Sequence, residues 1–228
     1  MKLTHRLLAL PFGLAAMIWL VGLVALSQAR MALHRSVQES SAQTVATAAN
    51  NIQRELRAAL DDWRVYTVSS GIRQAVEASN KEFEAMPNRE KYIDEQDKAW
   101  QEQPKDSVSP FMKAIFDNAT SADLKNHLAA LKAAYGYDVF GEAFVTNKYG
   151  ANVGQSDRTS DYRQSDEGWW KDTAANGWQV GDVDFDDSSG IYSADVSVAV
   201  TDAQNQVIGV TKAPYNIQGV FNQIAGAI

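Results

Sequence analysis

The sequence has 228 residues, with 28 acidic and 21 basic side chains, a formal net charge of −7 and no cysteine. A chain of this length holds one domain with its own core plus an additional segment. The acidic balance gives no indication of a nucleic-acid partner. The lack of cysteine excludes disulfides, a thiol nucleophile and a cysteine zinc site, but it does not identify the compartment.

The additional segment lies at the start of the chain. Residues Leu7 to Leu26 read "LLALPFGLAAMIWLVGLVAL" and carry no charge. A helix of this length matches a hydrocarbon core of about 30 Å, so the run predicts a single transmembrane helix. Lys2 and Arg6 before it favour a cytoplasmic amino terminus, but Arg30 and a further arginine follow closely, which weakens the positive-inside argument.

A cleaved signal peptide is the competing interpretation of this segment. Ser27, Gln28 and Ala29 resemble a small-residue cleavage site, whereas the apolar run is longer than an ordinary signal-peptide core. We therefore expect residues 1–28 to be a cytoplasmic tip and an uncleaved anchor.

A long stalk helix is predicted over residues 29–78, because the first glycine after the anchor is Gly71 and the first proline after it is Pro87. Apolar side chains recur at three- and four-residue steps along it, at Val45, Ala49, Ile52, Leu56, Leu60, Trp63 and Tyr66. This stripe can pack on the chain's own domain or form a dimer seam. We expect both, with the part from Ile52 packing internally and Val37 to Val45 available to a second subunit.

Residues 79–228 predict a helical middle followed by an antiparallel sheet. The charged segments up to Gly136 have helical spacing. Four later segments are rich in Val, Phe and Tyr and are separated in pairs by short turns, which indicates hairpins; they are "DVFGEAFVTN", "ANVGQS", "YSADVSVAVTD" and "QVIGVTKAPY". Between the pairs lies a crossing segment, Asp157 to Gly190, with a short helix around "DEGWWKDTAANG", and the tail is a last helix. The predicted class is α+β.

The sequence contains no recognisable catalytic or metal-binding pattern. His5, His34 and His127 are scattered and have no ligand spacing. Asp166 and Glu167 are a candidate acid–base pair, but no nucleophile accompanies them. We expect no enzyme activity, no cofactor and no metal.

An acidic run, "DVDFDDSSG", suggests a calcium loop at first sight. When it is aligned as an EF-hand from Asp182, its sixth position is Asp187, where glycine is needed, and its twelfth is Ser193, where glutamate is needed. The calcium interpretation therefore fails.

Three segments carry a resemblance to a known family: "TNKYGANV", "TSDYRQSDEGWW" and "VTDAQNQVIGV". With the anchor and stalk before them, they resemble the Cache (PDC, PAS-like) extracytoplasmic sensor domains of bacterial chemoreceptors and sensor histidine kinases. The resemblance extends from Ala29 to the end of the chain. It implies a PAS-like domain in the periplasm, held by one helix in the bacterial inner membrane, that binds a small ligand as the input module of signal transduction.

Two departures limit what this resemblance implies. Sensors of this type normally continue into a second membrane helix and a cytoplasmic transmitter, yet this sequence stops at Ile228. The chain is therefore either a receptor fragment or a singly anchored protein that works through a partner. The alternative function is an accessory or scaffold subunit of a larger membrane complex, and the expected protein partner is a second copy or another membrane protein.

The resemblance places the ligand on one face of the sheet, under the crossing segment. Aromatic walls and a few fixed polar groups suit such a site. The expected ligand-binding residues are Asp161, Tyr162, Asp166, Glu167, Trp169, Trp170, Asp184, Asp186, Tyr192 and Lys212. Consecutive helical residues point about 100° apart, so one tryptophan is expected at the site and the other in the core, unless both belong to the core. The expected walls of the site are Tyr162 and Trp170.

The second departure concerns the ligand. Amino-acid-binding Cache domains carry an R-x-W-Y pattern whose arginine holds the ligand carboxylate, whereas this chain has Glu167, Gly168, Trp169 and Trp170. The aspartate near the end of their last strand is also replaced, within "TKAPYN". The surplus of carboxylates predicts a cationic or neutral polar ligand, although Lys212 can neutralise one of them internally.

Overall fold

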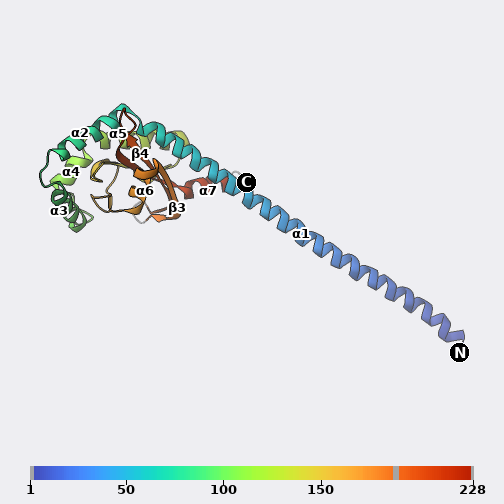
Figure 1. The fold of residues 1–228 in the computed structure, drawn as a ribbon. Helices are drawn as coiled ribbons and strands as arrows, with labels where there is room; N and C mark the ends of the chain where they lie inside the picture. Colours follow the sequence, from blue (N-terminus) through green and yellow to red (C-terminus); the bar gives the residue numbers. More distant parts are fainter. Residues whose placement is uncertain (1–2, 187–189, 227–228) are drawn as a thin grey trace. The chain divides into compact units, whose positions relative to one another are not determined.

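The computed structural model describes residues 3–186 and 190–226 (Figure 1). The chain forms two compact units, Met1–Asn51 and Ile52–Ile228. Helix α1, Leu3–Thr67, supplies the first unit and continues into the second. Residues 17–67 of α1 include a stretch of mean hydropathy 1.3, long and apolar enough to cross a membrane. A signal sequence near the amino terminus can also meet this criterion of length and composition.

The stalk helix ends earlier than the sequence predicts. It was expected to reach residue 78, but α1 ends at Thr67 and α2 starts at Ser70. The amide of Ser69 donates to the carbonyl of Tyr66, which closes a turn between the two helices. The local sequence "VYTVSSG" explains the break, because β-branched residues, serine and glycine are all weak helix formers.

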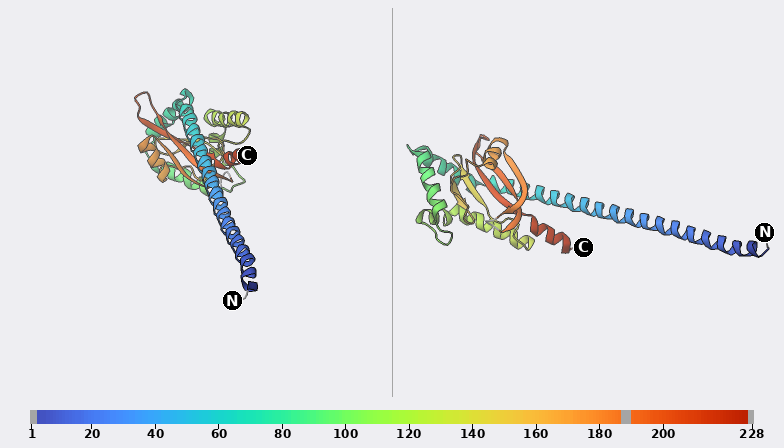
Figure 2. Two further views of the ribbon diagram at one scale, coloured as in Figure 1. Left: turned by 90° about the vertical axis from the view of Figure 1, so that its right-hand side faces the viewer. Right: turned by 90° about the horizontal axis from the view of Figure 1, so that it is seen from below.

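The charged middle of the chain is helical, as the sequence predicts. Four helices lie between α1 and the sheet in chain order (Figures 1 and 2). They are α2 (Ser70–Glu84), α3 (Arg89–Glu102), α4 (Pro110–Phe116) and α5 (Ala119–Tyr135). Helix α5 ends at Gly136, whose φ of 81° gives the left-handed carboxy-terminal cap that glycine favours.

Five antiparallel strands form one sheet in the order β2-β1-β5-β4-β3. They are β1 (Phe144–Asn147), β2 (Asn152–Gln155), β3 (Trp178–Asp186), β4 (Ile191–Thr201) and β5 (Val207–Asn216). The structure confirms the α+β class and the two predicted hairpins. Helix α6 (Gly168–Asn176) follows β2, and α7 (Ile217–Gly226) ends the described chain.

Strand β3 is absent from the sequence prediction, which treats residues 157–190 as a crossing segment with one helix. Its apolar residues do not alternate regularly, because the register shifts between Val180 and Val183. Val180 pairs with Val196 and Val183 with Ala194, so two residues of β3 lie opposite Asp195 alone. This β-bulge hides the two-residue period by which strands are recognised.

The main core lies on one face of the sheet. Trp63 of α1 is fully buried there, and its indole nitrogen donates to the hydroxyl of Thr211 in β5 over 3.0 Å. Apolar residues of α2, α5 and α7 pack around it against alternate residues of β4 and β5. Helix α6 occupies the other face, where the indole of Trp170 donates to Thr146 in β1.

A second apolar cluster joins α3 and α4 to the segment between β2 and α6. Trp100 of α3 is its centre, and its ring lies within 6.4 Å of the rings of Phe111, Phe116 and Tyr162, measured between centroids. The cluster therefore fixes residues 156–167, here called the pocket loop, from the side remote from the sheet.

Candidate ligand-binding site

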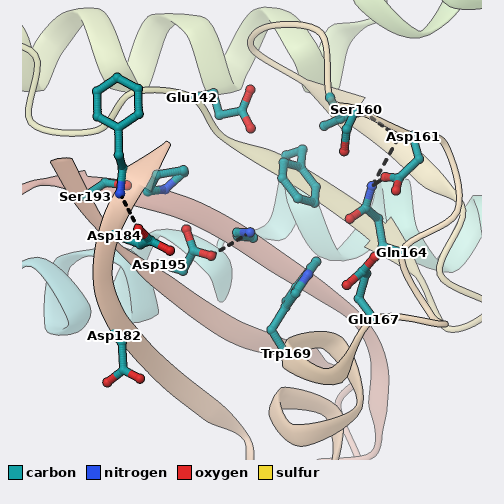
Figure 3. Close-up of a pocket in the computed structure, with 15 residues that line it drawn as sticks. Glu142, Ser160, Asp161, Gln164, Glu167, Trp169, Asp182, Asp184, Ser193 and Asp195 are labelled. Atoms are coloured by element: carbon teal, nitrogen blue, oxygen red, sulfur yellow. Dashed lines mark hydrogen bonds and ion pairs between the residues drawn. The ribbon is translucent and has the colours of Figure 1, made fainter. Parts of the chain in front are cut away.

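A cavity of about 430 Å³ lies on the α6 face of the sheet, between the strands and the pocket loop (Figure 3). Strands β1, β3, β4 and β5 contribute to it, together with the start of α6. The aromatic residues that line it are Phe144, Trp169 and Phe185. Its carboxylates belong to Glu142, Asp161, Glu167, Asp182, Asp184 and Asp195.

Strand alternation explains how the sheet contributes polar groups to the cavity. In β4, Ala194 and Val196 face the main core, so Ser193 and Asp195 face the cavity. In β5, Thr211 bonds to Trp63 on the core side, and the next residue, Lys212, lines the cavity.

The bulge in β3 sets the carboxylates at the edge of the cavity. Asp182 belongs to the bulge, and Asp184 pairs directly with Ser193, which is a cavity residue. The amide of Phe185 donates to the carboxylate of Asp184 over 2.8 Å and restricts its orientation. Bulges often redirect side chains next to functional sites, and this one brings two aspartates of an edge strand to the cavity.

Lys212 lies in the middle of the cavity floor and is already engaged. Its ammonium lies 2.7 Å from a carboxylate oxygen of Asp195 and 4.8 Å from the ring centroid of Trp169. The ring of Trp169 in turn meets Phe144 edge to face at 5.9 Å. Lys212 therefore holds Asp195 and the indole wall in place, and its charge is largely used within the protein.

The pocket loop is held by α3. The indole of Trp100 donates to the carbonyl of Thr159 over 2.9 Å. The carboxylate of Asp97 accepts the backbone amides of Tyr162 and Arg163 at 2.9 and 2.8 Å. Gly150 has a φ of 80°, and a side chain there would overlap Ser165, so the loop lies directly against the β1–β2 turn. The wall is thus fixed by contacts within the protein.

Asp161 projects from this loop into the cavity, where its environment disfavours charge. Burial, followed by the charges of Asp97 and Glu167, raises its pKa to about 6. A hydrogen bond from the amide of Gln164 opposes that rise. Asp161 is therefore a cavity carboxyl whose protonation responds to mildly acidic pH.

We expect Asp161→Asn to flatten the pH dependence of stability between about pH 4 and 7. The folded chain binds the Asp161 proton more tightly than the unfolded chain does, because the folded pKa is the higher one. The free energy of unfolding therefore rises as pH falls through the folded pKa of Asp161, and this contribution is lost as pH rises again. The asparagine variant should therefore gain stability relative to the parent chain at neutral pH and lose that gain near pH 4. Denaturant unfolding at several pH values measures the difference.

Asp172→Asn, which changes an exposed carboxyl of α6 outside the cavity, is the control and should leave the parent profile unchanged. Identical profiles for Asp161→Asn and the parent chain would contradict the prediction.

The structure brings five of the ten predicted site residues to the cavity and places four elsewhere, while the side chain of Asp186 is not described. Those that line it are Asp161, Glu167, Trp169, Asp184 and Lys212. Asp166 is exposed and does not line the cavity, although its charge contributes to the raised pKa of Asp161. Asp186 ends β3, and its side chain lies outside the described part of the structure.

Three predicted aromatic residues belong to other environments. Trp170 is bonded to Thr146 on the sheet, so of the two tryptophans it is Trp169 that lines the cavity. Tyr162 is buried in the second cluster, because the pocket loop folds onto α3 and α4. Tyr192 lies on the opposite face of β4 from Ser193 and packs against Phe185.

Several cavity residues were missed by sequence reasoning. A signal existed for Ser193 and Asp195, because polar and apolar residues alternate in "SADVSVAV". Glu142 is buried beside the cavity just before β1, where the same alternation with Phe144 indicates a shared face. The bulge removed any such signal for Asp182.

No protein-family model matches the sequence, and the search of curated proteins found no match. Solved structures that match include the sensor domain of the V. cholerae histidine kinase DctB, with 11% identity, 77% of this chain and 56% of that chain covered, and a TM-score of 0.45. The extracellular domain of a putative histidine kinase, rpHK1S-Z16, has 17% identity over 52% of this chain and 48% of its own, with a TM-score of 0.38.

The sensory domain of the Campylobacter jejuni chemoreceptor Tlp3 with isoleucine bound has 14% identity, covers 77% of this chain and 66% of its own, and has a TM-score of 0.39. The matched structures are sensor domains of histidine kinases and chemoreceptors, the classes that the sequence resemblance named. This chain spans about half the length of the first two. At these TM-scores, no ligand or site residue is transferred to this chain.

Proposed function

We propose that this chain is an extracytoplasmic sensing domain that binds a small molecule in the cavity over the sheet. The observation that carries the proposal is the cavity itself, whose 430 Å³ falls within the usual range for small-ligand sites. It combines the indole wall of Trp169 with polar groups on a fixed loop. A wall that is ordered before binding lowers the entropic cost of holding a ligand.

The residues that line the cavity suit ligand binding rather than catalysis. Among the described residues that line it there is neither histidine nor cysteine, and the hydroxyls come from Thr159, Ser160 and Ser193. The hydroxyl of Thr159 donates to the carbonyl of Asp161, so it is not poised for attack. These features favour a receptor over a hydrolase.

The proposal includes a single pass of α1 through a bacterial inner membrane, with the sensing domain in the periplasm and a second copy or another membrane protein as partner. Supporting features are the apolar stretch of α1 and the exposed side chains of Val37 and Val45. Intact mass and sedimentation of the membrane-extracted chain test these points. A mature terminus near Arg30, or a strictly monomeric species with no co-purifying protein, would contradict them.

We expect Trp169→Ala to weaken ligand binding by at least about tenfold, because the indole is the largest apolar surface facing the ligand. The measurement is a thermal-shift screen of metabolites against the full chain in detergent, followed by calorimetric titration of each compound that raises the melting temperature. A ligand that binds the folded state alone stabilises it by RT ln(1 + L/Kd), where L is the free ligand concentration, so the shift in melting temperature must keep rising with ligand concentration.

Trp178→Ala is the matched control, because Trp178 is a half-exposed tryptophan of β3 that does not line the cavity. Equal ligand affinity in the two variants would place the binding site elsewhere. Failure of every compound in a broad screen to shift the melting temperature would count against sensing and for the scaffold alternative.

A further inference from the structure

The charges around the cavity are strongly unbalanced. Among the described residues that line it, carboxylates outnumber cations six to one. The one cation that lines the cavity, Lys212, is paired with Asp195, so it does not pair with the carboxylates of Asp161, Glu167 and Asp184. Carboxylates gathered around a cavity repel one another unless a positive group joins them.

Nearby cations do not relieve this imbalance. The guanidinium of Arg158 donates to the carbonyls of Trp100, Gln103 and Pro104 at the end of α3. Arg163 pairs with acidic residues of α3, and the ammonium of Lys171 donates to a backbone carbonyl. None of these three side chains lines the cavity. The missing positive charge is therefore not supplied from the pocket loop.

The carboxylates lie on two sides of an aromatic surface. Figure 3 shows Asp161 and Glu167 on the side of the pocket loop and α6, and Asp184 on the side of β3, with the ring of Trp169 between them. Among the described residues, no group of three or more metal-ligating side chains is placed to hold a metal ion. The arrangement fits an elongated organic cation better than a metal ion.

We infer that the cavity takes a linear diamine, with one ammonium group at Asp161 and Glu167, the other at Asp184, and the methylene chain across the face of Trp169. Each ammonium group then gains charge-assisted hydrogen bonds from a different side of the cavity. The methylene groups adjoining each ammonium carry part of its charge, so the indole face attracts them as well. This inference rests on the proposed function, because it names the ligand class of the same site.

The test is calorimetric titration of the full chain in detergent with diaminoalkanes from diaminopropane to diamino-octane, at low salt and neutral pH. Matched probes are aminohexane, which has one charge, hexanedioate, which has the opposite charge, and calcium chloride. We expect one chain length of the diamines to bind best, and at least about tenfold more tightly than the monoamine, since losing one charge-assisted contact costs that much or more.

Two sets of substitutions identify the carboxylates that bind each ammonium group of the diamine. Asp184→Asn should reduce the preference for the diamine over the monoamine to less than about threefold, and Asp161→Asn combined with Glu167→Gln should do the same from the other side. Asp172→Asn should retain the full preference, because that carboxyl lies outside the cavity. Circular dichroism of each variant shows that it is folded.

The inference is overturned if no diamine binds, if the monoamine binds equally well, if hexanedioate or calcium binds more tightly, or if the preference survives both sets of substitutions. Its failure is separable from that of the proposed function. Binding of a neutral or anionic compound that Trp169→Ala abolishes would keep the cavity as a sensing site and reject the diamine alone. A screen without any binder would reject both.

Discussion

Replacing Trp63 by alanine is expected to destabilise the Ile52–Ile228 unit by about 3–5 kcal/mol, the usual cost of deleting a fully buried tryptophan. Trp63 is 0% exposed and packs against Tyr66, Phe140 and His127. Its loss leaves a void between α1 and the sheet and removes the hydrogen bond to Thr211. The Thr211 hydroxyl still donates to the carbonyl of Val198, so most of the cost is lost packing.

Amide hydrogen exchange of β4 and β5 in the full chain measures this effect. Exchange through global opening should accelerate more than about a hundredfold, since each 1.4 kcal/mol is a factor of about ten. Val65→Ala is the control, because Val65 lies on the same helical turns but is 72% exposed. A change in the Trp63 variant no larger than in the Val65 variant would show that α1 is not part of this core.

Replacing Trp100 by alanine is expected to cost a similar free energy and, in addition, to weaken ligand binding by at least about tenfold. Trp100 is 1% exposed at the centre of the second cluster, and its indole fixes the carbonyl of Thr159. Without it, Thr159 and Asp161 lose their support from α3, and a binding site whose wall must be ordered by the ligand binds less tightly.

Arg158→Ala keeps this prediction testable if Trp100→Ala fails to fold. Arg158 donates to three carbonyls at the end of α3 and does not line the cavity, so its loss should loosen the loop with little loss of core packing. Calorimetric titration with the best ligand, and exchange of the loop amides, measure the two effects. Unchanged affinity in a variant whose loop exchanges faster would show that α3 does not preorganise the site.

Local pattern was enough to predict most of the fold. Strand alternation and turn residues located four strands, and helical spacing located the charged middle. Strand β3 escaped because a bulge breaks its period between Val180 and Val183. The predicted stalk helix is longer than the observed one, because no glycine or proline marks the end of α1 at Thr67.

Only those features of the site that depend on residues close together in the sequence could be predicted. The charged stretch before the two tryptophans lies over the sheet, where Asp161, Glu167 and Trp169 line a cavity, and their role in ligand binding stays a prediction. Tyr162 was misplaced because its partners, Trp100 and Phe111, lie about fifty to sixty residues earlier in the chain, and no local pattern indicates such a contact. Long-range packing, rather than composition, decided which aromatic residues face the cavity.

Adjacent residues of the central strand β5 face the cavity on one side of the sheet and the main core on the other. Lys212 faces the cavity and holds Asp195, while Thr211 faces the other way and accepts the indole hydrogen of Trp63. The cavity floor at Lys212 and the attachment of α1 at Thr211 are therefore one peptide unit apart. The thickness of a single strand separates the cavity from the helix that carries Trp63.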